Sequence, residues 1–195
     1  MMPKLLSDYE KWLHFPQLPE EMHTELEGIA GQQDEIDDRF YRNLSFGTGG
    51  LRGKMGAGTN RMNIYTILKT SIGLAHYLKG ISELPSCAIG FDSRKHSLEF
   101  AKLSAAAMVS CGVRVHLFEE LIPTPILSYA VHYLRCDGGV MITASHNPKE
   151  YNGYKVYDKT GCQIDEETAK LIEDAISLQD DLVPQLPAYE DLYEQ

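Results

Sequence analysis

Short apolar runs alternate with helical patterns from residue 63 onward, and this alternation most constrains what the chain can fold into. Apolar runs at 86–91, 113–118 and 140–142 are separated by segments with helical spacing. Runs of this length with β-branched residues are typical of buried strands. Strand–helix–strand alternation favours parallel strands covered by helices. We therefore expect an α/β fold: a three-layer α/β/α domain with a mainly parallel, mixed sheet.

Polar residues and glycines indicate where the helices begin and end. Asn63 is a candidate N-cap, and Gly80 is the expected stop of the same helix. Ser97 is the candidate cap of the next helix, which Gly112 should end. The expected helices are 63–79, 97 to about 112, one that follows a loop containing 123–125 and runs to about 135, and 165–177, with a further strand at 154–157.

The first 44 residues have a different character, because they are polar, acidic and prone to form helices. Patterns at 5–12, from Pro19 onward and at 34–44 predict three short helices, the last with Ile36, Phe40 and Leu44 on one stripe. The expected layout is a helical extension at 1–44, the α/β/α domain at 45–178, and an acidic linker or tail at 179–195.

Charge and composition exclude several classes of protein. The formal net charge is -10, and most of it lies after residue 164, so the body of the chain is nearly neutral. A nucleic-acid binder would show a basic face, and none is indicated. The longest apolar runs fall short of the ~18 residues that a membrane span needs. The N-terminus lacks the apolar segment of a secretory signal, so we expect a cytoplasmic protein without membrane contact.

The four cysteines indicate neither a zinc site nor a disulfide framework. They are spread along the chain without a Cys-x-x-Cys pair. Reduced cysteines in or near the core are the simplest interpretation.

A glycine-rich segment at 45–58, SFGTGGLRGKMGAG, has the composition of a loop that lets backbone N–H groups approach phosphate. It fails the P-loop pattern, which needs glycine at Thr48 and a hydroxyl residue at Met55. It also fails the dinucleotide pattern, which needs glycine at Arg52. Arg52 is suited to phosphate contact, although a solvated surface arginine explains the residue as well.

The segment 138–155, GGVMITASHNPKEYNGYK, carries a hydroxyl, an imidazole, a carboxamide and an amine on a loop between two expected strands. Ser145 lacks the flanking glycines of a hydrolase elbow, and His146 is too close in sequence to serve as its base. Ser145 and Asn147 could equally stabilise the turn. Topology favours a site, because polar loops at 92–96, 119–124 and 144–152 follow the carboxyl ends of strands.

The serine loop closely resembles the phosphoserine signature of the α-D-phosphohexomutases, the phosphoglucomutase/phosphomannomutase family. The matching residues are Thr143 to Pro148, Asn152, Gly153 and Lys155. Three further segments resemble landmarks of the family's first domain in the right order: FGTGGLRG at 46–53, DSR at 92–94 and PTP at 123–125. The segment DRFYRNLSFGTGGLRG is similar to the phosphoglucomutase-2/phosphopentomutase branch.

The resemblance implies roles for several of the matching residues. Ser145 would carry the phosphoryl group and ligate Mg²⁺ through that phosphate, and Lys155 would be the general acid/base. Arg52 would stabilise charge on the transferring phosphoryl. Thr48 and Arg94 would contact phosphate, although Arg94 could instead form a structural ion pair. His146 and Asn147 would orient the loop and the phosphate.

The implied function is a phosphosugar mutase that interconverts hexose 1-phosphate and 6-phosphate through a phosphoserine and a bisphosphorylated sugar. Glucose phosphate is the expected substrate, with mannose or pentose phosphates, or a non-catalytic phosphosugar-binding module, as alternatives. The motifs cover only a first domain, because no later metal or sugar loop of the family is found. We therefore expect Mg²⁺ to take most ligands from a second domain, a sugar bisphosphate to act as activator, and this chain alone to show little turnover.

Overall fold

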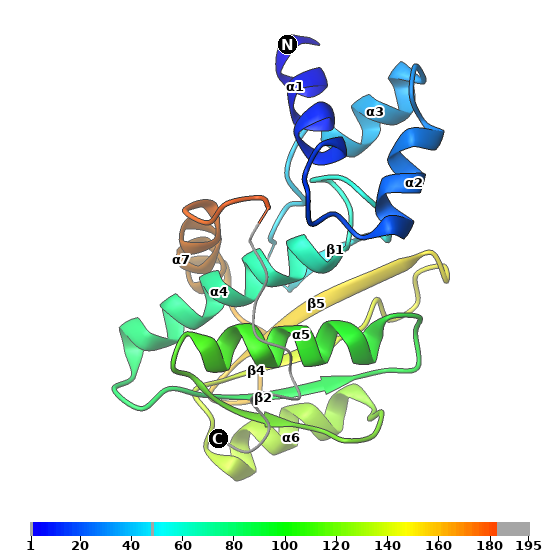
Figure 1. Ribbon diagram of the computed structural model, residues 1–195. Coiled ribbons are helices and arrows are strands. Elements are labelled where there is room, and N and C mark those ends of the chain that lie inside the picture. Colours follow the sequence, from blue (N-terminus) through cyan, green and yellow to red (C-terminus); the bar gives the residue numbers. More distant parts are fainter. Residues whose placement is uncertain (1, 48, 183–195) are drawn as a thin grey trace.

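The computed structural model describes residues 2–47 and 49–182 (Figure 1). Three helices precede the sheet, and the later helices alternate with its strands. The helices are α1 (Met2–Leu13), α2 (Glu20–Gly28), α3 (Gln33–Phe40), α4 (Ile64–Ile81), α5 (Ser97–Ser110), α6 (Thr124–Leu134) and α7 (Glu166–Ser177). The strands are β1 (Gly50–Lys54), β2 (Ser86–Phe91), β3 (Arg114–Leu117), β4 (Gly138–Ile142) and β5 (Tyr151–Asp158).

The five strands form one mixed sheet in the order β1-β5-β4-β2-β3. Strand β2 pairs in parallel with β3 and β4, whereas β5 runs antiparallel to both β4 and β1. Helices α4 and α5 cover one face, with α7 packed against α4, and α6 covers the other face (Figure 1). The expected α/β/α architecture with a mixed sheet is confirmed.

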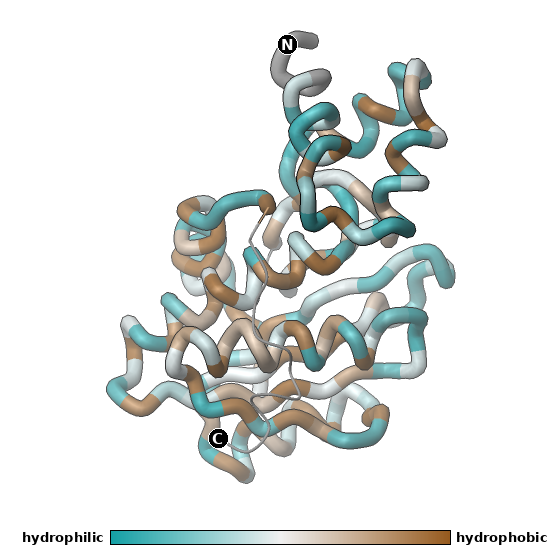
Figure 2. The backbone as a smooth tube through the Cα atoms, in the orientation of Figure 1, coloured by the Kyte–Doolittle hydropathy of each residue, from teal (hydrophilic) through white to brown (hydrophobic). Residues whose placement is uncertain are grey.

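The central strands lie in the core. Every residue of β4 is buried, and so are the last five residues of β2. Helices α4 and α5 bury apolar side chains against one face of these strands, and α6 buries Leu127 and Val131 against the other. In Figure 2 the helices carry brown segments, while the loops at the carboxyl ends of β2 and β4 are teal to pale. The polar loops therefore sit on a rigid apolar base.

The predicted boundaries of α4 and α5 need correction. Asn63 is the N-cap of α4, and its side chain accepts a hydrogen bond from the Thr66 N–H at 3.0 Å. The helix continues through Gly80 to Ile81, because nothing near Gly80 obliges it to end there. Ser97 is the first residue of α5 and not its cap; the cap position is His96, in the left-handed region at φ 64°.

The glycine-rich segment is not a free loop, because Gly50–Lys54 forms strand β1 at the sheet edge. Its glycines permit close approach of neighbouring groups. A Cβ on Gly50 would lie 1.8 Å from the Tyr154 carbonyl oxygen, and one on Gly53 would lie 2.8 Å from the Leu44 side chain. The glycine-rich composition indicated a loop and not a strand, because strand β5, which stabilises β1, lies far along the chain.

The N-terminal helices pack around an aromatic cluster, which includes Trp12, Phe40 and Tyr65. Trp12 makes edge-on contacts with both Phe40 and Tyr65, with ring centroids 5.9 and 5.3 Å apart. Since Tyr65 belongs to α4, the extension shares its core with the α/β body. The predicted helix at 34–44 is too long: α3 ends at Phe40, and Leu44 instead packs beside β1.

The stretch expected to be a tail begins with packed residues. Asp181 forms an ion pair with Lys69 at 2.6 Å, and Leu182 is buried in the aromatic cluster. Residues 183–195 lie outside the part of the chain that the structure describes. Within the part it does describe, no helix is both long and apolar enough to cross a membrane.

Candidate active site

Ser145 stands at the tip of the turn between β4 and β5, exposed to solvent. Its backbone is in the left-handed region at φ 54°, which is uncommon for a residue with a side chain. The turn is held by the buried Thr143, whose Oγ1 accepts the Ser145 N–H at 2.9 Å, and by Asn147, whose N–H donates to the Ala144 carbonyl. Strained conformations of this kind occur often at functional sites, where the surrounding structure imposes them.

Arg94 holds the backbone of the serine loop from inside. Its Nη2 donates to the carbonyl oxygens of Ser145 at 2.7 Å and Asn147 at 2.6 Å. Its Nη1 donates to the carbonyl oxygens of Pro148 at 2.9 Å and Tyr151 at 3.0 Å. One planar guanidinium thus fixes four carbonyls of one loop, which a lysine could not do.

Two residues that sequence reasoning did not assign to the site support this arrangement. Asp92 accepts the Arg94 N–H at 2.9 Å and the Ser97 hydroxyl at 2.8 Å. Asn152 is fully buried, donates to the Ser97 hydroxyl, and accepts the Gly153 N–H. Asp92 is two residues before Arg94, a spacing at which aspartate often bonds the backbone, and this signal could have identified it.

Arg52 reaches the serine loop from β1. It lies opposite Gly153 of β5, and its Nη1 donates to Asn147 Oδ1 at 2.9 Å. The absence of a side chain at Gly153 matters, because a Cβ there would lie 2.6 Å from the Thr143 carbonyl oxygen. The guanidinium is therefore tied to the residue two positions beyond Ser145.

Lys155 lies on the same face of the sheet as Arg52, because it pairs with Gly50, two residues before Arg52 in β1. Burial, and then the positive charge of Arg52, lower the pKa of Lys155. Among the described residues no carboxylate forms an ion pair with it. Both cations lie opposite glycines across the β1–β5 ladder, where the backbone approaches too closely for a side chain to stand beside them.

His146 is adjacent to Ser145, and its Nδ1 lies 3.4 Å from Ser145 Oγ. This distance is long for a hydrogen bond, so it suits orientation of the hydroxyl better than proton transfer. The predicted phosphate contact at Thr48 lies outside the described residues.

The structure brings two of the three predicted loops together. Ile142 and Phe91 are paired neighbours at the ends of β4 and β2, so the loops that follow them meet. They line an open depression of about 780 Å³ with Ser145, Asn147, Arg94 and Lys149 around it. The 119–124 loop contacts the end of β2, where Ile122 donates its N–H to the carbonyl of Phe91, but none of its residues lines the depression.

Few metal ligands surround this loop. Within residues 2–47 and 49–182, no group of three or more histidine, cysteine, aspartate or glutamate side chains could hold a metal ion. The nearest charges on the β1–β5 face are cationic. Ser145 would therefore supply at most one oxygen ligand through a phosphate, and the described residues alone do not make a magnesium site.

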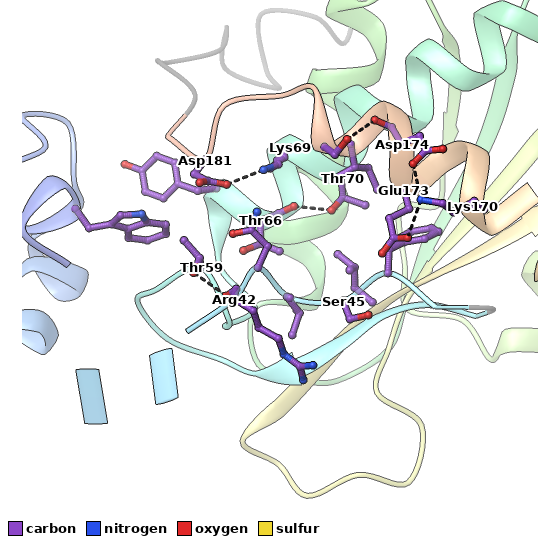
Figure 3. Close-up of a pocket in the computed structure, with 18 residues that line it drawn as sticks. Arg42, Ser45, Thr59, Thr66, Lys69, Thr70, Lys170, Glu173, Asp174 and Asp181 are labelled. Carbon is purple, nitrogen blue, oxygen red and sulfur yellow. Dashed lines mark hydrogen bonds and ion pairs between the residues drawn. The ribbon is translucent and has the colours of Figure 1, made fainter. Parts of the chain in front are cut away.

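A second cavity, of about 460 Å³, lies between the extension, α4 and α7 (Figure 3). Its lining mixes polar and apolar side chains, and two of its cations already have carboxylate partners. Lys69 pairs with Asp181 at 2.6 Å, and Lys170 pairs with Asp174 at 2.5 Å. None of the residues expected to take part in chemistry lines it, and its paired lysines make it a poor phosphate site.

Comparison with known proteins gives a consistent result. Residues 43–182 match the family model described as phosphoglucomutase/phosphomannomutase, alpha/beta/alpha domain I. The chain is 48% identical over 130 residues to the phosphoglucomutase of Staphylococcus haemolyticus (strain JCSC1435), covering 67% of this chain and 24% of that protein. It is 42% identical over 174 residues to the phosphopentomutase of Mus musculus, covering 84% of this chain and 28% of that protein.

A solved structure has the same fold. A Thermus thermophilus protein described as a phosphomannomutase superposes with a TM-score of 0.65 at 33% identity. The match covers 69% of this chain and 30% of that one. The chain thus spans about a quarter of the length of the curated phosphoglucomutases it matches, and 28% of the mouse phosphopentomutase. Because the matched region contains the sheet, the serine loop and the Arg52 strand, the chain belongs to the phosphoglucomutase/phosphomannomutase family, of which it contains the α/β/α domain I.

Proposed function

We propose that this chain is the phosphoserine-carrying domain of a phosphosugar mutase, with Ser145 as the residue that carries the phosphoryl group. The observation that carries the proposal is the conformation of the serine loop, which is strained at Ser145 and fixed by hydrogen bonds. Ser145 is exposed at φ 54°, and Arg94 fixes four carbonyls of its loop. Positioning and charge stabilisation supply most of the catalysis of phosphoryl transfer, so a rigid carrier serine suits this chemistry.

In the proposed transfer, a hydroxyl oxygen of the sugar phosphate attacks the phosphorus carried on Ser145. The bond from phosphorus to Ser145 Oγ breaks as the bond to the sugar oxygen forms. The sugar hydroxyl loses its proton to Lys155 Nζ, and Oγ takes a proton from solvent. The lowered pKa of Lys155 supports this role, because it increases the fraction of neutral amine able to accept the proton.

The two arginines are proposed to act differently. Arg52 donates one hydrogen bond to Asn147, and its other N–H groups would donate to the equatorial oxygens of the phosphoryl group. The N–H groups on both terminal nitrogens of Arg94 donate to loop carbonyls. We therefore propose that Arg94 positions the loop and does not contact the phosphate. His146 would orient the Ser145 hydroxyl, and Asn147 would hold Arg52. Thr48 keeps its proposed phosphate contact on the resemblance alone.

Magnesium fits this site only in part. A phosphate on Ser145 would offer Mg²⁺ the oxygen ligand that this ion prefers. The remaining ligands would come from other parts of a family protein. When bound, the ion would neutralise charge on the phosphoryl oxygens. A sugar bisphosphate would be the agent that loads Ser145, and a phosphosugar would be the substrate.

The names of the relatives include three different sugar substrates. Relatives named phosphoglucomutase and phosphopentomutase, and a structural neighbour described as a phosphomannomutase, all match this domain. We propose glucose 1-phosphate and glucose 6-phosphate as the pair, with mannose or pentose phosphates as the alternatives. The isolated chain should show little or no turnover, and robust conversion of glucose 1-phosphate in a coupled assay would contradict this expectation.

The test is titration of the purified chain with glucose 1,6-bisphosphate, followed by intact mass spectrometry. We expect the mass of one phosphoryl group to be added to the wild-type chain and to Ser93→Ala, and none to be added to Ser145→Ala. Ser93 is the matched control, because it is an exposed serine lining the same depression. Binding of the bisphosphate without any transfer would favour a non-catalytic phosphosugar-binding module instead.

A further inference from the structure

Helix α6 is apolar on both of its long faces. Its inner face buries Leu127 and Val131 against the sheet. Its outer face exposes Ile126, Tyr129 and Tyr133, which stand at i, i+3 and i+7 and so share one side. The 11 residues of the helix include no aspartate, glutamate, lysine or arginine. A helix with two apolar faces is normally covered on both of them, whereas α6 forms the outer layer of this fold (Figure 1).

The outer face is a coherent patch of side chains. Tyr129 and Tyr133 are 63% and 69% exposed, and their rings stack with centroids 5.7 Å apart and planes 21° apart. Ile126 stands beside the stacked rings on the helix, the exposed Leu134 follows Tyr133 at the end of the helix, and the exposed Leu121 precedes its start. We call these five residues the α6 patch. Tyrosine-rich patches with aliphatic neighbours are typical of protein interfaces.

We propose that the α6 patch is the contact through which two copies of this chain form an antiparallel dimer. Charge at the ends of the helix argues for a second copy as the occupant. The exposed Glu120 precedes the N-terminus, and the exposed Arg135 follows the C-terminus. When two α6 helices run antiparallel, the acidic end of each lies beside the basic end of the other. The partly positive N-terminus of each helix dipole then also lies beside the partly negative C-terminus of the other.

The positions of the apolar residues fit the same two-fold arrangement. A two-fold axis that passes midway between positions 126 and 133, next to Tyr129, sets each Ile126 against Tyr133 of the other copy. The patch is small. Its five side chains would bury on the order of 500 Å² per copy, at the lower limit for a specific interface. We therefore expect a weak dimer with a dissociation constant in the micromolar range.

Sedimentation equilibrium from low micromolar to near-millimolar concentration tests the proposal on this chain. We expect a reversible monomer–dimer equilibrium, and Tyr129→Glu should leave no detectable dimer. Leu84→Glu is the matched control, since Leu84 is 84% exposed and lies outside the patch, so its dissociation constant should equal that of the wild-type chain. A wild-type chain that stays monomeric overturns the proposal and leaves another part of a longer family polypeptide as the occupant.

Charge exchange tests the antiparallel geometry separately. Glu120→Arg alone and Arg135→Glu alone should each weaken the dimer about tenfold, because symmetry reverses two contacts at once. The double variant should recover the wild-type dissociation constant. Circular dichroism checks that each variant is folded. A double variant that is as weak as the singles, or a Tyr129→Glu chain that still dimerises, contradicts the proposal.

Discussion

The serine loop and the N-terminal extension are held in place by different kinds of contact. Arg94, Asp92 and Asn152 fix the serine loop through hydrogen bonds, most of them to backbone groups. The extension rests on Trp12 and Phe40, which are buried among other aromatic rings. Hydrogen bonds set direction precisely enough to hold a strained backbone, whereas apolar burial supplies stability without fixing one geometry. The two regions should therefore respond differently to mutation.

The largest effect is expected at Gly153, on the site side of this comparison. Gly153→Ala would place a methyl group 2.6 Å from the Thr143 carbonyl oxygen and 2.9 Å from the Leu51 carbonyl oxygen. We expect a loss of about 4 kcal/mol or more in unfolding free energy, measured by urea denaturation. Gly80→Ala is the matched control, because its Cβ meets nothing and the helix should gain about 0.5–1 kcal/mol. Equal stability of the two variants would refute the close-approach argument.

Phe40→Ala should remove support from the extension and leave the site intact. Deleting a buried phenylalanine costs about 3–5 kcal/mol, and we expect the lower half of that range here because the cluster can partly collapse. Trp12, whose ring centroid lies 5.9 Å from that of Phe40, reports the change through its fluorescence. Tyr41→Ala, at a half-exposed neighbour, should cost less than about 1 kcal/mol. Loss of phosphoryl transfer to Ser145 in Phe40→Ala would show that the regions are coupled.

Arg94→Lys should damage the serine loop although the charge is kept. A lysine ammonium cannot reach four carbonyls at once, so about 2–3 kcal/mol of unfolding free energy should be lost, and transfer from the bisphosphate should slow. Arg114→Lys, at an exposed arginine of β3, is the control and should cost no more than about 0.5 kcal/mol. If Arg94→Lys transfers phosphate at the wild-type rate, Arg94 does not position the loop.

Lys155 should give the smallest effect on stability and a diagnostic dependence on pH. Its pKa is lower in the folded chain than the ordinary lysine value of 10.5, so the protonated amine opposes folding at neutral pH. The destabilisation by the protonated amine is complete below the pKa of Lys155 in the folded chain. It disappears as the pH rises to the pKa of Lys155 in the unfolded chain. Lys155→Met should therefore be slightly more stable than the wild-type chain at pH 7, and this advantage should fade towards pH 10.5. Urea denaturation at both pH values checks it, and an advantage that grows with pH contradicts the assignment.

The sequence predicted local features well wherever neighbouring residues determine them. The bounds of β2 and the Asn63 cap follow from short apolar runs and a single side-chain hydrogen bond. Strand β1 was missed because Arg52 and its neighbours are stabilised by β5, about a hundred residues later. The serine loop was identified through its resemblance to the family. The role of Arg94 inside it could not be read from sequence, because its four partners are backbone carbonyls that any residue carries.

The central claim is that Ser145 carries the phosphoryl group, and mapping the position of the phosphate tests it most directly. After reaction with glucose 1,6-bisphosphate, the chain is digested and its phosphopeptides are fragmented by tandem mass spectrometry. We expect one phosphate on Ser145 in the wild-type chain, at lower yield in Arg52→Ala and unchanged yield in Ser93→Ala. Phosphate found only on Ser93, Thr143 or another residue would contradict it.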